Sequence, residues 1–302
     1  MKEVIGIQDL EEMLRNRTHV RSQPRDELLM PSVRDLLRNS GTAGTQKGPM
    51  AERCQPSSTA KPVTSRSSKA DLEAFFNSPP IQELKLQICD IGRRMWQRAY
   101  VDGNGGNIAI RVGEGIALCT PTGVSKGFMK PEDLCLVDLE GTQLCGGKAR
   151  TSEILMHLQI MKRQPRAVAS VHCHPPCSTG FAVAGVEPPA GMISEFELFV
   201  SVATAPYRTP GTPELGELIA DLADKHNTIL MANHGVVAWS HNNVEDAYFK
   251  IEILEACCHT MLVTLQLGQP PKTMTPAQVQ ELLKIKQKLG IPDPRIGLKE
   301  GE

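Results

Sequence analysis

The sequence predicts a layered α/β domain, because short strand-like segments alternate with helical patterns along most of its length. The 302 residues suffice for one large globular domain, alone or with appendages. Aromatic residues make up only 4% of the chain, so the core must consist mainly of Val, Ile, Leu, Met and Ala. This composition fits a layered α/β domain, although it does not by itself select one.

The folded domain is expected to span residues 70–270, followed by a C-terminal helix and tail over residues 271–302. The predicted strands cover residues 107–112, 116–119, 134–138, 167–174 and 228–238. The predicted helices cover residues 80–100, 152–163, 213–226, 243–267 and 276–289. The first of these helices is opened by the Pro79-Pro80 pair, and the last begins after Thr275 and ends at Gly290.

The residues before the domain differ from it in composition and hydrophobic pattern. Residues 1–38 contain two short amphipathic patterns, the first of which places Ile7, Leu10 and Leu14 at helical spacing. Residues 39–69 are rich in Ser, Thr, Gly, Pro and Lys and contain almost no large apolar side chains. Such a segment cannot bury enough surface to offset its ordering entropy, so it is predicted to be a flexible linker.

Composition argues against several classes of protein. The net charge is −1, and no basic stripe of the kind expected in a nucleic-acid-binding protein is present. The longest apolar runs are too short to span a bilayer, and the first residues carry acids within their apolar stretch, unlike a secretory signal. Nine cysteines without a Cys-x-x-Cys pair suit a reducing compartment. A cytoplasmic protein that binds neither membrane nor nucleic acid is therefore expected.

The strongest chemical signal is the His-x-His pair formed by His172 and His174 at the end of a predicted buried strand. Residues i and i+2 of a strand share one face, so both imidazoles can bind one ion while Cys173 points away. His234 lies in another apolar, strand-like run. Three histidines with an open fourth position are typical of a catalytic zinc. A His-x-His pair also occurs by chance, and a site that uses Cys173 and Cys177 is an alternative.

Three turns offer hydroxyl and amide groups to an anion. Residues 103–107 read Gly-Asn-Gly-Gly-Asn, residues 120–123 read Thr-Pro-Thr-Gly, and residues 151–153 read Thr-Ser-Glu at a helix start. Glycine permits close backbone approach, and free N–H groups at a helix start favour an anion. Each turn also has a structural explanation: the first can be a plain tight turn, and Thr151 can be an ordinary helix cap.

Glu153 is the candidate for proton transfer, because it lies beside the third of these turns. A carboxylate close to a metal that binds a hydroxyketone can remove a proton from the adjacent carbon or hydroxyl. The alternative is that Glu153 only balances the dipole at the start of its helix.

In this order and at this spacing, the motifs resemble those of the class II aldolase/adducin family. The resemblance covers about residues 80–265 and implies a three-layered α/β/α domain with a central mixed or antiparallel sheet. It also implies a homotetramer with active sites between subunits. The motifs that carry it are Gly106-Asn107, Thr122-Gly123, Thr151-Ser152-Glu153, His172-x-His174 and Asn233-His234-Gly235.

Similarity to L-fuculose-phosphate aldolases implies a role for each of these positions. It implies that His172, His174 and His234 hold one Zn²⁺, or another divalent metal, per chain, and that Glu153 is the acid/base. Phosphate would be bound by Gly106, Asn107, Thr122, Gly123, Thr151 and Ser152. The implied reaction cleaves a ketose 1-phosphate of the L-fuculose or L-rhamnulose type to dihydroxyacetone phosphate and lactaldehyde, with zinc stabilising the enediolate.

This chain departs from the fuculose-type pattern in one respect. Those enzymes carry a tyrosine proton donor in the segment that aligns with residues 189–195, and this segment has none. Glu195 or a residue from elsewhere is expected to substitute, and Tyr207 is expected to pack within the fold. The alternative functions are a ribulose-phosphate 4-epimerase, a methylthioribulose-phosphate dehydratase, and a non-catalytic, adducin-like interaction module.

The N-terminal extension has two interpretations. An amphipathic helix followed by a linker resembles the encapsulation peptides that guide enzymes into bacterial microcompartments, which would make a shell protein a partner of residues 1–38. Alternatively, these helices pack on the catalytic body or on a neighbouring subunit.

Overall fold

The computed structural model describes residues 63–268 and 270–297. Residues 1–38, which carry the predicted amphipathic helices, and most of the predicted linker over 39–69 lie outside the described residues, so the encapsulation interpretation stays a prediction. Within the described part, Thr64 forms an isolated bridge with Glu114, and helix α3 begins at Lys69.

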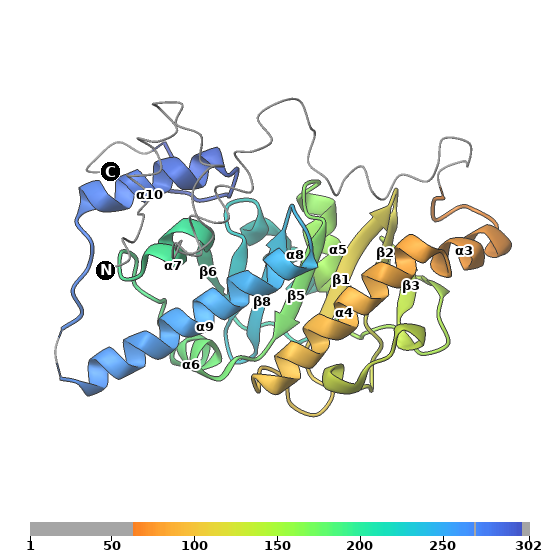
Figure 1. The fold of residues 1–302 in the computed structure, drawn as a ribbon, viewed down its shortest axis with the longest axis horizontal. Helices are drawn as coiled ribbons and strands as arrows, with labels where there is room; N and C mark the ends of the chain where they lie inside the picture. Colours follow the sequence, from red (N-terminus) through yellow and green to blue (C-terminus); the bar gives the residue numbers. More distant parts are fainter. Residues whose placement is uncertain (1–62, 269, 298–302) are drawn as a thin grey trace, which may run out of the picture. The chain divides into compact units, whose positions relative to one another are not determined.

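A single eight-stranded sheet forms the centre of the described domain (Figure 1). The strand order is β4-β3-β2-β1-β5-β8-β7-β6, and all neighbours are antiparallel except β6 and β7. The strands are β1 (Asn107–Gly113), β2 (Ile116–Cys119), β3 (Cys135–Asp138), β4 (Gln143–Cys145), β5 (Ala169–Cys173), β6 (Val202–Ala205), β7 (Thr228–Met231) and β8 (Gly235–Ser240). The predicted central mixed or antiparallel sheet is thereby confirmed.

Helices cover both faces of the sheet, which gives the predicted three layers. The helices are α3 (Lys69–Phe76), α4 (Pro79–Gln97), α5 (Ile154–Arg163), α6 (Pro176–Ala184), α7 (Ser194–Phe199), α8 (Pro213–Ala223), α9 (Val244–Gln266) and α10 (Pro276–Lys288). Helices α4, α6 and α9 pack on one face, and α5 and α8 pack together on the other (Figure 1). None of the described helices combines the length and the hydrophobicity that a membrane crossing requires.

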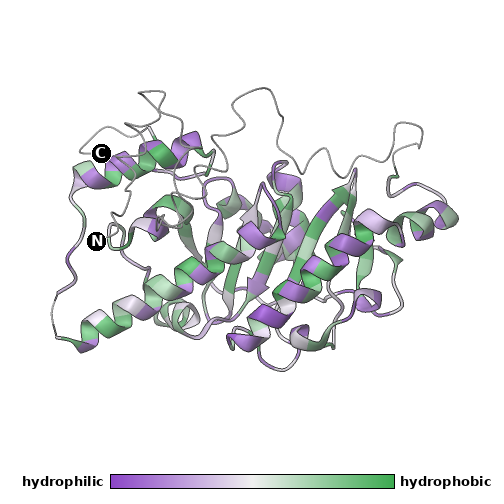
Figure 2. Cartoon of the chain, viewed as in Figure 1, coloured by the Kyte–Doolittle hydropathy of each residue, from purple (hydrophilic) through white to green (hydrophobic). Residues whose placement is uncertain are grey.

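Alternation along each strand divides the apolar side chains between two cores. In β1, Ile108 and Ile110 belong to the core under α4 and α9, whereas Ala109 belongs to the core under α5 and α8. Figure 2 shows the strands as largely hydrophobic and the helices as mixed, as expected when a sheet is buried on both faces and each helix on one.

The prediction of one strand over residues 228–238 is wrong. The chain reverses at residues 232–234, so that β7 and β8 form an antiparallel hairpin, and Asn233 adopts a left-handed conformation with φ 56°. Both strands are buried, so the apolar run continues through Ala232 and hides the turn. The short elements β4, β6, α3, α6 and α7 were not predicted, because they span only three to nine residues.

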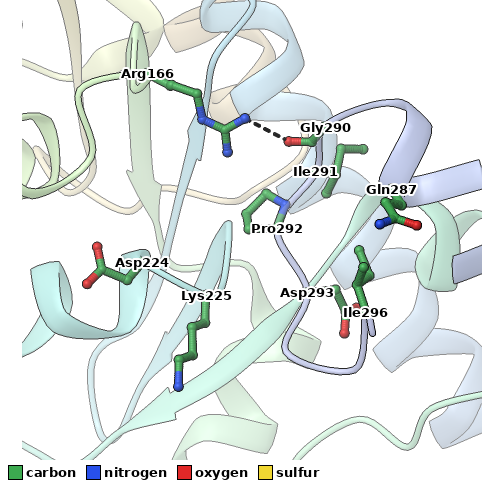
Figure 3. A pocket seen from close by; sticks show the side chains of 9 residues that line it. All are labelled: Arg166, Asp224, Lys225, Gln287, Gly290, Ile291, Pro292, Asp293 and Ile296. Carbon is green, nitrogen blue, oxygen red and sulfur yellow. Dashed lines mark hydrogen bonds between the residues drawn. The ribbon is translucent and has the colours of Figure 1, made fainter. Parts of the chain in front are cut away.

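Buried ion pairs anchor the C-terminal segment. The Lys286 ammonium, fully buried, donates to the carbonyls of Glu197 (3.0 Å) and Val200 (2.7 Å) and to the Asp293 carboxylate (2.7 Å). Beside this anchor, Arg166, the end of α8 and residues 287–296 line an open pocket of about 350 Å³. Figure 3 shows the Arg166 guanidinium donating to the carbonyl of Gly290 at the rim of this pocket.

Gly106 and Gly123 offer a matched test of backbone constraint near the proposed site. Their φ values are +71° and +69°, so alanine is strained at both positions. A Cβ at Gly106 would lie 2.6 Å from Cγ1 of Val101 and 2.9 Å from the His172 carbonyl oxygen. A Cβ at Gly123 would meet no atom of the described residues within 4 Å.

Gly123→Ala should therefore lower the free energy of unfolding by about 1 kcal/mol, which is the cost of the left-handed conformation. Gly106→Ala should cost about 2 kcal/mol more, because the backbone must also shift. Urea unfolding of the two variants measures the difference, provided that the m-values agree. Equal losses of unfolding free energy in the two variants would show that the backbone at Gly106 accommodates a Cβ at little energetic cost.

Candidate metal centre and active site

The three predicted ligand histidines meet at one end of the central strands. His172 lies in β5, His174 follows the end of that strand, and His234 lies in the turn between β7 and β8. One ligand atom from each imidazole can be chosen so that all lie within 4.8 Å of one another. Cys173 is buried in the core under α4 and α9 and is not part of this cluster.

The hydrogen bonds of His172 and His174 leave the Nε2 atoms of the two rings facing each other. Nδ1 of His172 lies 2.8 Å from the carbonyl oxygen of Val236, and Nδ1 of His174 lies 3.2 Å from the Asp102 carboxylate. Both oxygens only accept, so each Nδ1 carries the proton. Burial lowers the pKa of His172 to about 3, against the opposing effect of Glu153, so this imidazole is neutral. Nε2 of His172 therefore carries a lone pair, and Nε2 of His174 lies 3.2 Å from it.

This arrangement fits a cation. Ring nitrogens of the three histidines lie within 4.8 Å of one another, so one ion between them would bind all three imidazoles. The third imidazole, His234, has a buried Nδ1 without a hydrogen-bond partner among the described residues. Imidazoles whose second nitrogen donates to a carboxylate or a backbone carbonyl are the usual ligands of zinc. The donor set therefore suits Zn²⁺ or a similar divalent ion with an open position.

Glu153 lies immediately before α5 and reaches the histidines. Its carboxylate oxygens are 3.4 Å from Nε2 of His172 and 3.2 Å from Nε2 of His234, and it accepts a hydrogen bond of 2.7 Å from the Asn107 amide. Burial alone would raise the pKa of Glu153, but the imidazoles and the Asn107 amide outweigh this effect and hold it well below its usual range. The carboxylate is consequently ionised and able to accept a proton.

The three predicted anion-binding turns are neighbours in space. The Ile108 amide donates to the Thr120 hydroxyl (3.2 Å), and the Thr151 amide donates to the Thr120 carbonyl (3.0 Å). Among the candidate residues, Thr122, Gly123 and Ser152 are exposed, whereas Gly106, Asn107 and Thr151 are buried. The Asn107 side chain is bound to Glu153, and the Thr122 amide donates to Ala149, so neither group is free for a ligand without rearrangement.

Sequence reasoning missed three residues that shape this region. Asp102 orients His174, and the sequence hint was an acid directly before the glycine-rich turn. The buried Lys126 ties two turns together by donating to the carbonyls of Asn104 (2.8 Å) and Val124 (2.7 Å). Burial lowers the pKa of Lys126 to about 8, although the charge of Glu153 opposes this shift. The third missed residue is His157, which is buried in α5.

Two predictions bear on the absent tyrosine: Glu195 as its substitute, and Tyr207 as a residue packed within the fold. Glu195 is exposed in α7 and makes no hydrogen bond or ion pair to the three histidines or to Glu153. The expectation that Tyr207 packs within the fold is wrong, because its side chain is 52% exposed. It follows β6, which is an edge strand of the sheet.

Comparison with known proteins agrees with this geometry. Residues 86–262 match the model of the class II aldolase and adducin N-terminal domain. A 3-oxo-tetronate 4-phosphate decarboxylase of Haemophilus influenzae is 32% identical over 206 residues, which are 67% of this chain and 95% of that protein. An L-fuculose phosphate aldolase of Methanococcus maripaludis is 35% identical over 175 residues, which are 56% of this chain and 89% of that protein.

Among solved structures, the chain is similar to YgbL of Klebsiella pneumoniae, which is described as an aldolase, epimerase or decarboxylase. The TM-score is 0.62 at 27% identity, and the match covers 67% of this chain and 98% of that one. The family match spans more than half of the chain and includes Glu153 and all three histidines. The chain therefore belongs to the class II aldolase and adducin family.

Proposed function

We propose that this chain is a metal-dependent lyase that breaks a carbon–carbon bond in a sugar phosphate. The observation that carries the proposal is an ionised carboxylate, Glu153, held 3.2–3.4 Å from nitrogen atoms of two histidines in a cluster suited to a divalent metal. Proton transfer and metal-assisted charge stabilisation are the two requirements of this chemistry.

Each residue of the site has a separate task. His172, His174 and His234 would hold the metal, and their hydrogen bonds to Val236 and Asp102 would orient two of the rings. When bound, the metal would act as a Lewis acid that polarises substrate oxygen atoms. Glu153 would accept a proton from the carbon or hydroxyl next to the substrate carbonyl.

The proposed substrate is a ketose 1-phosphate of the L-fuculose or L-rhamnulose type, cleaved to dihydroxyacetone phosphate and lactaldehyde. Support comes from the similarity to an L-fuculose phosphate aldolase. The three neighbouring turns with Gly106, Asn107, Thr122, Gly123, Thr151 and Ser152 are proposed to bind the phosphate. Thr122, Gly123 and Ser152 are the exposed members of this set, so contact with the phosphate would begin there. A homotetramer is proposed from the same family resemblance.

A second candidate is decarboxylation of a 3-oxo acid phosphate. The H. influenzae relative carries that name and aligns over 95% of its length. Both reactions leave negative charge on the carbon next to a carbonyl, and the same site would stabilise it. The two candidates differ in the departing group, which is an aldehyde in the first and carbon dioxide in the second.

Product analysis separates these candidates. The metal-loaded protein is incubated with L-fuculose 1-phosphate, L-rhamnulose 1-phosphate, ribulose 5-phosphate and 3-oxo-tetronate 4-phosphate, and the products are identified by mass spectrometry. We expect dihydroxyacetone phosphate from one of the first two substrates. Release of carbon dioxide from the last substrate alone would favour the decarboxylase, and an isomeric pentose phosphate would indicate an epimerase.

Metal binding is tested by elemental analysis of the purified protein. We expect about one zinc, or another divalent ion, per chain, because three histidines leave one position for substrate. The double variant His172→Ala/His174→Ala should lose the metal. His259→Ala, which changes an exposed histidine in α9, is the control and should retain it. Full metal content in the double variant would contradict the assignment.

Glu153→Gln keeps the size of the side chain but removes the proton acceptor. Turnover should fall by about 10²–10⁴-fold with the metal retained, which is the usual contribution of a general acid or base. Glu140→Gln, at a largely exposed carboxylate, serves as the matched control. Unchanged turnover in the Glu153 variant would reduce this residue to a role at the helix start.

A further inference from the structure

A buried chain of hydrogen bonds runs from the Glu153 carboxylate into the core between the sheet and α5. The Asn107 amide in β1 donates to Glu153 (2.7 Å), and its oxygen lies 2.5 Å from Nε2 of His157 in α5. Nδ1 of His157 lies 2.6 Å from the hydroxyl of Ser170 in β5. His157 and Ser170 are fully buried, and Asn107 is nearly so.

Burying polar groups is costly, so these hydrogen bonds must form in one specific pattern. The neighbours of His157 on the buried face of α5 are apolar, among them Ile154, Leu158 and Met161. An imidazole in such surroundings is destabilising unless both of its nitrogens have partners. Here both nitrogens have partners, so the hydrogen-bonded groups can adopt one ordered state rather than several.

The geometry at Asn107 sets the direction of every hydrogen bond in this chain. Its NH₂ group faces a Glu153 carboxylate oxygen and its own oxygen faces Nε2 of His157. Burial lowers the pKa of His157 to about 4, although Glu153 opposes this shift, so the imidazole is neutral and carries one proton. That proton must be on Nε2, and Nδ1 then accepts from the Ser170 hydroxyl.

The opposite arrangement is excluded by repulsion at the carboxylate. If His157 carried its proton on Nδ1, its Nε2 would require a donor, and the Asn107 amide would have to turn over. The Asn107 oxygen would then face a carboxylate oxygen at 2.7 Å with no proton between them. The proton position on His157 and the orientation of Asn107 are thus linked.

We propose that His157 is a positioning residue for Glu153. Its Nε2–H holds the Asn107 amide so that the nitrogen faces the carboxylate and keeps the carboxylate directed at His172 and His234. The proposal rests on the acid/base role proposed for Glu153. It adds a residue that touches neither substrate nor metal and yet sets the geometry of the proton acceptor.

Two substitutions separate positioning from packing. In His157→Gln, the side-chain amide nitrogen can take the place of Nε2 and donate to Asn107. In His157→Asn, the shorter side chain places its polar group near Ser170 and cannot reach Asn107. Both variants lose the ring and comparable packing, so a merely structural role would affect them similarly.

We expect kcat to fall by about 10-fold or more in His157→Asn, with KM and metal content little changed, as is usual when an outer partner of a site is removed. His157→Gln should restore most of that loss. Equal losses of kcat in the two variants, or an effect confined to KM, would overturn the proposal. Thermal unfolding of both variants checks that each remains folded at the assay temperature.

A spectroscopic measurement tests the same inference without turnover. Long-range ¹H–¹⁵N correlation spectra of the full chain, labelled on histidine and assigned through His157→Gln, report which ring nitrogen carries the proton. A proton on Nε2 supports the proposal, whereas a proton on Nδ1 or on both nitrogens overturns it. Because this readout needs neither substrate nor metal, it tests the hydrogen-bond directions at His157 separately from the proposed function, so failure of one is distinguishable from failure of the other.

Discussion

An ionised carboxylate and three imidazoles share one end of a buried strand, and satisfying these polar groups constrains the surrounding fold. Glu153 is held between His172, His234 and Asn107, each of which comes from a different part of the chain. Residues 107 and 172 are register partners in β1 and β5, so the sheet itself sets the distance between amide and imidazole. Strand pairing therefore fixes one side of the site, whereas His234 and Glu153 come from the segments that connect strands and helices.

Close backbone approach completes the arrangement on the other side of β5. Gly235 starts β8, and a Cβ there would lie 2.6 Å from Cδ2 of His174 and 2.7 Å from the Cys173 carbonyl oxygen. The absent side chain lets the hairpin reach the strand end, and Asn233 supplies the left-handed turn residue that brings His234 back toward β5. The position of His234 thus depends on Asn233 and Gly235, which matter for their backbone conformation and small size and not for the chemistry of their side chains.

The sequence predicted the fold class and the convergence of His172 and His174, because strand alternation carries that information directly. It did not predict the hairpin at residues 232–234, since two strands buried on both faces read as one apolar run. The contacts of Asn107 were also hidden, because they depend on the register of β1 with β5 and on where α5 lies. The role of His157 could not be predicted from the sequence. A single histidine in an amphipathic helix indicates no function until the two residues that bind its ring nitrogens are known.

The two ends of the sheet bear on how copies of this chain can associate. Strand β4 has three residues and β6 has four, and the Thr204 amide of β6 donates to the Glu187 side chain (3.1 Å) instead of remaining open. Short edges with occupied donors resist the addition of further strands. Association through a continuous intermolecular sheet at these two described edges is accordingly disfavoured.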